Sequence, residues 1–196
     1  MATQQQSRSF DAKTHTYILG QSVVPSVTQI MKSVFGQPWE ASEYYMQRGS
    51  VIHAFAAMIA RKQEFFDCDV RIAGHIAAIR KFFTEFQPVI LPDGIETSLF
   101  SDQYRFAGTP DLLMYLGKTK VILDYKSSFS GLEPIQLGGY SILTGITDGL
   151  AVELHDDGSY RLSEVWKLKK WQNRFLAALT ICNTKRELGI KEEKEV

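Results

Sequence analysis

An unbroken apolar run at residues 121–123 leads directly into Asp124, Tyr125 and Lys126. A short apolar run of this kind predicts a buried β-strand, and the polar residues that follow it mark the edge of the core. Alternate side chains of a strand share a face, so Asp124 and Lys126 point the same way while Tyr125 points into the opposite layer. The sequence therefore predicts a buried strand with a carboxylate and an ammonium group side by side at its end.

A second carboxylate, Asp111, follows the turn-forming segment 108–110. Hydrolysis of a phosphodiester near neutral pH needs a divalent cation held by carboxylates, a water whose pKa that cation lowers, and a positive group near the phosphate. Asp111 and Asp124 are candidates for holding the cation, and Lys126 for the positive group. The alternative is two acids at the sheet edge beside a solvated lysine, since the spacing acid-any-Lys also occurs elsewhere in the chain.

Length and composition predict one globular domain over residues 1–196, because 44% hydrophobic and 22% charged residues are ordinary for a single core. No apolar stretch is long enough for a membrane span and the N-terminus lacks a signal pattern, so we expect an intracellular protein with no membrane partner. The two cysteines, Cys68 and Cys182, are too few for a disulfide framework or a four-cysteine iron–sulfur cluster.

The charges balance, with 22 basic and 22 acidic residues. Nucleic-acid binding would therefore depend on local patches rather than on a basic molecule as a whole. Lys167, Lys170 and Arg174 recur at helical steps in the C-terminal segment. We favour a solvated helix surface over a phosphate-tracking face for these three side chains.

Local patterns predict a continuous α/β unit in which a central mixed sheet is flanked by helices, with an N-terminal hairpin and a C-terminal helix. The expected helices cover residues 27–34 (capped by Ser26), 42–47, 50–62, 70–86 (capped by Asp67 or Asp69), 134–144 and 167–188; the expected strands cover residues 14–19, 23–24, 95–101, 104–107, 112–116, 120–125, 150–155 and 160–164; residues 191–196 are expected to form a flexible tail.

This αβββαβ order resembles the restriction-endonuclease-like core of the PD-(D/E)xK nuclease superfamily. The first acid lies early in the middle strand region, and the acid-any-Lys pattern lies on the third strand. Arg48 and Gly49 followed by His53 resemble a motif on the early helix of its RecB-like nucleases. The resemblance runs over residues 48–155, and the opening hairpin with segment 25–30 also resembles phage members. A lone histidine on an apolar helix is otherwise a core residue, but the small residues after His53 would let this helix approach the sheet closely.

Two further positions extend the resemblance. Glu96 lies on the expected strand before Asp111, where the RecB-like group often has a glutamate. The alternative is that Glu96 is a carboxylate on the surface of that strand. Gln136 and Tyr140, four residues apart on one helix face, resemble the glutamine-to-tyrosine motif of that group and would position the strand or the lysine.

The resemblance implies one or two Mg²⁺ or Mn²⁺ ions and no iron–sulfur cluster. It implies a metal shell made by His53, Glu96, Asp111, Asp124 and the Tyr125 carbonyl, and a catalytic set of Asp111, Asp124, Lys126, Gln136 and Tyr140. His15, His75 and His155 have no companions at motif-like spacing and are predicted to be structural or solvated.

The expected activity is that of a DNA exonuclease in recombination, repair or end processing, and the resemblance to phage members allows an enzyme that a phage encodes in a bacterial host. The sequence has no phosphate-cradling loop of the helicase type, so such an enzyme would act alone or with a recombinase, helicase or single-strand-binding partner. The alternatives are a structure-specific or restriction-like endonuclease and a non-catalytic DNA-end-binding protein.

Overall fold

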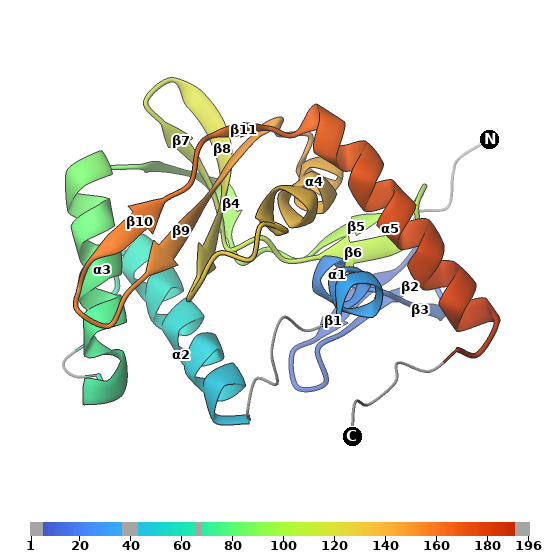
Figure 1. Ribbon diagram of the computed structural model, residues 1–196, viewed down its shortest axis with the longest axis horizontal. Coiled ribbons are helices and arrows are strands. Elements are labelled where there is room, and N and C mark those ends of the chain that lie inside the picture. The colour runs from blue at the N-terminus through green and yellow to red at the C-terminus, as the bar shows by residue number, and fades with distance from the viewer. Residues whose placement is uncertain (1–5, 37–42, 66–67, 191–196) are drawn as a thin grey trace.

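A six-stranded mixed sheet forms the centre of the protein in the computed structural model, which describes residues 6–36, 43–65 and 68–190 (Figure 1). The strands of this sheet are β4 (Val89–Ile95), β7 (Leu112–Leu116), β8 (Thr119–Lys126), β9 (Asp148–Leu154), β10 (Tyr160–Leu162) and the short β11 (Trp166–Lys167). They run in the order β10-β9-β8-β7-β4, with β11 also paired to β9. The pairing of β8 with β9 is parallel and the other pairings are antiparallel.

Helices cover both faces of this sheet (Figure 1). On one face lie α2 (Glu43–Ala60) and α3 (Val70–Phe86); on the other lie α1 (Val27–Phe35), α4 (Glu133–Thr144) and α5 (Lys169–Glu187). The α/β prediction is confirmed, as is the αβββαβ order, which is formed by the α2–α3 layer, β4, β7, β8, α4 and β9. No helix in the described part of the chain is both long and apolar enough to cross a bilayer.

Two small sheets extend the core on the side of α1. The first consists of β1 (Arg8–Asp11), β2 (Thr16–Leu19) and β3 (Ser22–Val24), and the second of β5 (Leu99–Ser101) and β6 (Phe106–Gly108). A bridge between Ser26 and Ala107 joins β6 to the start of α1, and the Ala107 amide donates to the Pro25 carbonyl at 3.0 Å. The N-terminal segment is thereby fixed next to the residues that precede Asp111.

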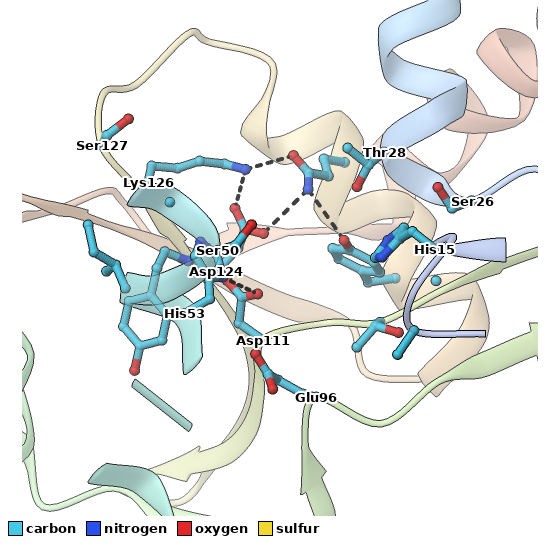
Figure 2. A pocket seen from close by; sticks show the side chains of 18 of the residues that line it. His15, Ser26, Thr28, Ser50, His53, Glu96, Asp111, Asp124, Lys126 and Ser127 are labelled. Carbon is cyan, nitrogen blue, oxygen red and sulfur yellow. Dashed lines mark hydrogen bonds and ion pairs between the residues drawn. The ribbon is translucent and has the colours of Figure 1, made fainter. Parts of the chain in front are cut away.

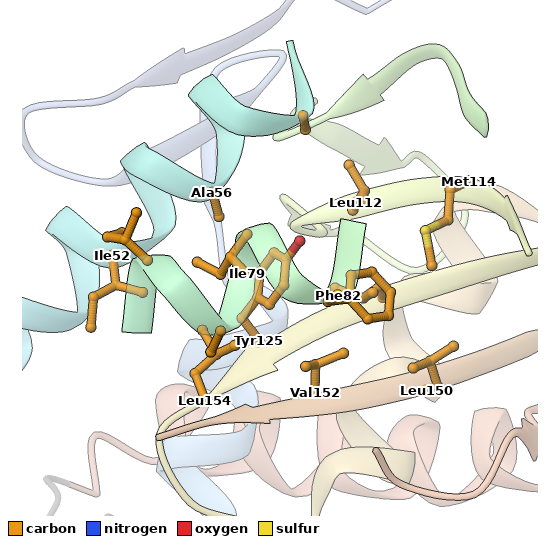
Figure 3. Packing of buried hydrophobic residues seen from close by; sticks show 14 of the residues in the cluster. Ile52, Ala56, Ile79, Phe82, Leu112, Met114, Tyr125, Leu150, Val152 and Leu154 are labelled. Atoms are coloured by element: carbon orange, nitrogen blue, oxygen red, sulfur yellow. The ribbon is translucent and has the colours of Figure 1, made fainter. Parts of the chain in front are cut away.

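The alternation along β8 follows the sequence prediction. Leu123 and Tyr125 are buried in the cluster under α2 and α3, with Ile79 and Phe82 of α3 packed nearby (Figure 3). Ile122 is buried in the opposite cluster, among residues of α1, α4 and α5. Because side chains two apart share a face, the Asp124 side chain lies on the α4 face of the sheet, as expected.

Several strand predictions were wrong. The strands β1 and β11 and most of β4 were not predicted, and residues 95–101 form no single strand. Instead β4 ends at Ile95 and β5 begins at Leu99, in a different sheet. No element was predicted over residues 89–94, which contain Pro92 and Gly94, two residue types that are uncommon inside strands. The chain accommodates them through a shift of register between Ile90 and Ile95, with Asp93 in the left-handed region at φ 52°.

The helix predictions were closer. Ser26 caps α1 through a reciprocal capping box with Gln29, and Asp69 caps α3 by accepting from the Arg71 amide. The two helices expected over 42–47 and 50–62 are one continuous helix, α2, which passes through Gly49 without a break. Asp67 and the predicted tail 191–196 lie outside the described residues.

Gly74 permits the closest backbone contact between α3 and the turn after β9. A Cβ at this position would lie 1.6 Å from the Asp156 carbonyl oxygen, so Gly74→Ala must push the helix off the turn. We expect a destabilisation of about 1–3 kcal/mol or more, which lowers the melting temperature by roughly 2–4 °C per kcal/mol. Gly49→Ala is the matched control, because its Cβ would meet nothing within 4 Å. Equal melting temperatures for the two variants would contradict this packing.

Candidate active site

All eight residues predicted for the site line one cleft of about 660 Å³ (Figure 2). These residues are His53, Glu96, Asp111, Asp124, Tyr125, Lys126, Gln136 and Tyr140. They come from α2, from the end of β4, from the segment before β7, from the end of β8 and from α4. The fold therefore brings together side chains that are far apart in the sequence.

Asp111 is held by partners on both carboxylate oxygens. Its Oδ1 lies 2.9 Å from His53 Nδ1, and its Oδ2 accepts a hydrogen bond of 2.7 Å from the Tyr125 amide. Burial acts to raise the pKa of Asp111, but the charge and hydrogen bond of His53 and the Tyr125 amide outweigh it and hold the pKa below the usual value. Asp111 is therefore a fixed negative charge in the cleft.

Asp124 and Lys126 form a buried ion pair on the α4 face of β8. The Lys126 Nζ lies 2.7 Å from Asp124 Oδ2, and the Asp124 side chain is only 4% exposed. Burial raises the pKa of Asp124 above its ordinary value, while Lys126 opposes this and the nearby Asp111 adds to it. Burial tends to lower the pKa of Lys126, but the charge of Asp124 outweighs it, so the ammonium stays charged.

Gln136 connects the lysine, the acid and Tyr140. Its Oε1 accepts from Lys126 Nζ at 2.9 Å, and its Nε2 donates to Asp124 Oδ1 and to the Tyr140 hydroxyl, each at 3.4 Å. The spacing of four residues on α4 puts Gln136 and Tyr140 on one face, as predicted. The amide fixes where the ammonium group stands relative to the carboxylate.

Gly108 explains why the segment before Asp111 can run so close to α1 and α4. A Cβ on Gly108 would lie 2.9 Å from Val27 Cγ2 and 3.0 Å from Tyr140 Cε1. Both distances are shorter than ordinary carbon contacts, so a larger residue would push the segment outward. The close approach places Asp111 within the cleft.

His53 reaches the cleft because α2 packs tightly on the sheet. Ala56, Ala57 and Ala60 of the same helix are buried, as the small residues after His53 suggested. The His53 side chain is 34% exposed and faces the cleft beside Asp111, so the alternative of an enclosed core histidine does not describe it. The negative charge of Asp111 raises the pKa of His53 to about 9. Its role as a metal ligand stays a prediction.

The His53–Asp111 pair makes stability depend on pH. The pKa of His53 is raised from 6.5 to about 9 in the folded chain. The pair therefore stabilises fully below pH 6.5, and its contribution is lost as the pH rises through about 9. We expect His53→Gln to lower the melting temperature of metal-free protein by about 2–4 °C at pH 6, the shift for roughly 1 kcal/mol, and by nothing at pH 10. A deficit that is the same at both pH values would contradict the pair.

Glu96 requires a correction. It lies just after β4 rather than on a strand, in the left-handed region at φ 49°, and its amide donates to the Asp111 carbonyl at 3.2 Å. Burial and the charge of Asp111 raise the pKa of Glu96. The side chain lines the same cleft as the two aspartates, but whether it reaches a metal stays a prediction.

We did not predict that the N-terminal sheet would form a wall of this cleft. Phe10, His15 and Tyr17 line it, although His15 was read as structural or solvated. The Tyr17 hydroxyl lies 2.7 Å from Thr109 Oγ1, two residues before Asp111. Contacts between residues 92 positions apart leave no periodic signal in a sequence. Ring-bearing residues at alternate positions of the predicted hairpin were the one available hint.

The other two histidines differ in their surroundings. His75 lines the cleft but is 4% exposed, and burial, reinforced by the charge of Arg48, lowers its pKa. His155 Nδ1 lies 2.8 Å from Ser159 Oγ and its Nε2 lies 3.5 Å from Glu153, at the turn that joins β9 to β10. We assign these two a structural role.

The basic residues of the C-terminal segment lie apart from the cleft. Lys170 and Arg174 stack on Trp171 of α5, and Lys167 pairs with Asp148. The helix α5 packs against the side of α4 that carries Gly138 and Gly139, whereas Gln136 and Tyr140 line the cleft. This placement agrees with a solvated helix surface.

A divalent cation fits the donor chemistry of the cleft. Carboxylates with one imidazole suit Mg²⁺ or Mn²⁺, and the buried Asp124 Oδ2 receives no well-directed hydrogen bond even though Lys126 Nζ is close. Within the described residues, no three His, Cys, Asp or Glu side chains are already grouped as a metal site. His53, Asp111 and Asp124 are the residues that would hold a cation.

Comparisons with known proteins leave the family of this chain open. Its sequence matches no family model and no curated protein. Among solved structures it is similar to the alkaline exonuclease LHK-Exo from Laribacter hongkongensis, with 11% identity over 84% of this chain and 88% of that one and a TM-score of 0.46. LHK-Exo in complex with dAMP gives 13% identity over 85% and 93% of the two chains and a TM-score of 0.42.

Proposed function

We propose that this chain is a divalent-metal-dependent nuclease that hydrolyses phosphodiester bonds of DNA in the cleft between α2, α4 and the N-terminal sheet. The observation that carries the proposal is the convergence of two carboxylates, the buried Asp124 and the partly buried Asp111, with Lys126 in one open cleft. Burying this many charges is costly unless they are paired, and such clusters gather where chemistry requires them.

The carboxylates have different roles in this proposal. Asp111, whose pKa is held low and whose two oxygens both have partners, stays negatively charged. Asp124, which is paired with the Lys126 ammonium, would bind a cation in place of that ammonium. A bound Mg²⁺ or Mn²⁺ would supply Lewis acidity toward the phosphate and lower the pKa of a water. His53 must lose its proton to act as a ligand, so metal binding releases a proton below about pH 9.

Lys126 offsets the negative charge that develops on the phosphate as the attacking water oxygen bonds to phosphorus and the P–O bond to the leaving DNA strand breaks. Gln136 holds its ammonium group near Asp124, and Tyr140 supports Gln136. Lys126 is therefore a catalytic residue in this proposal, and Gln136 and Tyr140 are positioning residues. The connected set also distinguishes an enzyme from a DNA-end-binding protein, which needs neither the lysine nor both acids.

Within the nuclease class, we propose a RecB-like exonuclease that acts in recombination, repair or end processing. The sequence motif around His53, together with Gln136 and Tyr140 on α4, supports this narrower assignment. A partner that supplies or unwinds DNA ends belongs to the same proposal. The experiment below tests the activity and the dependence on ends together.

Purified protein should degrade linear DNA in Mg²⁺ or Mn²⁺ and leave covalently closed circular DNA intact. Chelation should abolish the activity, and Mn²⁺ or Mg²⁺ but not Ca²⁺ should restore it, because Ca²⁺ binds loosely and activates water poorly. Linearised and closed forms of one plasmid are the matched substrates. Cutting of the closed circle would favour an endonuclease, and undiminished cutting in excess chelator would contradict a metal mechanism.

A further inference from the structure

The cleft has a second wall that the proposed chemistry does not use. Phe10 of β1, Tyr17 of β2, and Ala12 and His15 of the turn between these strands line it, together with Thr28 of α1. Figure 2 shows His15 and Thr28 on the side of the cleft away from His53. A molecule bound at the acids would lie next to this wall.

The aromatic rings of this wall pack on one another from the core toward the cleft. Phe10 and Tyr17 are paired in register across β1 and β2, and their ring centroids lie 4.5 Å apart. Tyr17 is buried at 1% exposure, with Phe100 at 5.8 Å behind it, whereas Phe10 is partly exposed. The His15 and Phe10 rings are nearly perpendicular, with centroids 5.2 Å apart, and His15 is exposed. Phe10 and His15 are thus the outermost rings on the side of the cleft.

This arrangement is fixed relative to the catalytic acids. The Asp11 carboxylate accepts from the Lys13 amide at 2.8 Å, which orders the turn between β1 and β2. At the other end of the wall, the Tyr17 hydroxyl bonds Thr109, two residues before Asp111. Tyr17 therefore connects the aromatic wall to the segment that carries Asp111. A ligand that contacts both the wall and this acid binds to a preformed arrangement.

The charge of the cleft limits how a nucleic acid can be held. Of the described residues that line it, Lys126 is the single Lys or Arg and His53, with its pKa of about 9, adds a second positive charge, against three carboxylates from Glu96, Asp111 and Asp124. The whole chain has zero formal net charge. Contacts to the phosphate backbone, which dominate most nucleic-acid binding, are weak here, so affinity has to come from the bases. Aromatic rings bind bases by stacking on their faces, whatever the sequence.

A base offers a free face only outside a duplex, because paired bases are stacked on one another. We propose that the rings of Phe10 and His15 form an aromatic surface for one base of a single-stranded nucleic acid, which lies face-on to one ring and against the edge of the other, and whose backbone reaches Asp111 and Asp124. The position of the backbone rests on the proposed nuclease function, whereas the stacking surface does not. The substrate class is then single-stranded DNA, or the frayed single-stranded end of a duplex.

Binding of a fluorescein-labelled oligothymidylate, measured by anisotropy in excess chelator, tests the surface without requiring turnover. Wild type should bind the single strand more tightly than a blunt duplex. Phe10→Leu keeps an apolar side chain against Tyr17 but removes the flat ring, so it should weaken single-strand binding roughly tenfold. Phe10→Trp, which enlarges the ring, should bind at least as tightly as wild type.

Phe100→Leu is the matched control, because Phe100 also packs against Tyr17 but does not line the cleft. Its single-strand affinity should equal that of wild type. Equal affinity of wild type and Phe10→Leu, loss of binding in Phe10→Trp, or tighter binding of the blunt duplex would overturn the proposal. Single-strand binding that depends on Phe10 in a protein that cuts no DNA would instead uphold the surface and refute the nuclease.

Discussion

Asp111→Asn should abolish DNA cleavage while leaving the fold intact. Asp111 is the carboxylate that contacts both His53 and the Tyr125 amide, so the substitution removes the fixed negative charge of the cleft. The loss should exceed the roughly 10–100-fold effect typical of residues that only orient a metal ligand. Single-turnover cleavage of end-labelled DNA in Mn²⁺ measures it.

Asp156→Asn, an exposed aspartate in the β9–β10 turn, is the charge-matched control and should cut at the wild-type rate. Calorimetric titration with Mn²⁺ should show weakened binding for Asp111→Asn alone. If Asp111→Asn cuts DNA within a few-fold of wild type, Asp111 is a structural acid and the proposed site is wrong.

Lys126→Met should lower turnover by roughly a hundredfold or more, the usual cost of losing one group that stabilises the transition state. The methionine retains most of the apolar stem, so folding is preserved, and Mn²⁺ binding should persist because Asp111 and Asp124 remain. Without the Lys126 ammonium, no neighbouring lysine charge counteracts the effect of burial on Asp124, so the pKa of Asp124 rises further. Mn²⁺ affinity of the variant should therefore fall more steeply than that of wild type as the pH is lowered.

Lys118→Met, on the exposed turn between β7 and β8, controls for the loss of one positive charge. Titration calorimetry and cleavage assays on both variants separate binding from turnover. Near-normal turnover in Lys126→Met would make the lysine a simple partner of Asp124, without a role in the reaction.

Much of the site was predictable because it depends on local periodicity. The apolar run before Asp124 indicated a buried strand, and its alternation correctly put Asp124 and Lys126 on one face. The spacing of Gln136 and Tyr140 indicated one helix face. These features follow from the repeat lengths of strands and helices, which a single sequence displays.

The features that were not predictable depend on distant contacts or on broken patterns. The strand β4 contains Pro92 and Gly94, so its composition indicated a loop, and only pairing with β7 reveals it as a strand. Glu96 was therefore placed on the wrong element. The wall formed by Phe10 and His15 exists because β6 and α1 hold the N-terminal sheet beside Asp111, and no local pattern encodes that contact.

The most direct test of the nuclease assignment compares wild type, Asp111→Asn, Lys126→Met and the double variant in one cleavage assay, after chelation and readdition of Mn²⁺. Groups that act as one catalytic unit are strongly non-additive, so the double variant should be about as inactive as Asp111→Asn alone. Metal-dependent cleavage by wild type with this pattern is the predicted result. Equal cleavage by all four proteins, or cleavage that persists without a divalent ion, would contradict a nuclease site at Asp111, Asp124 and Lys126.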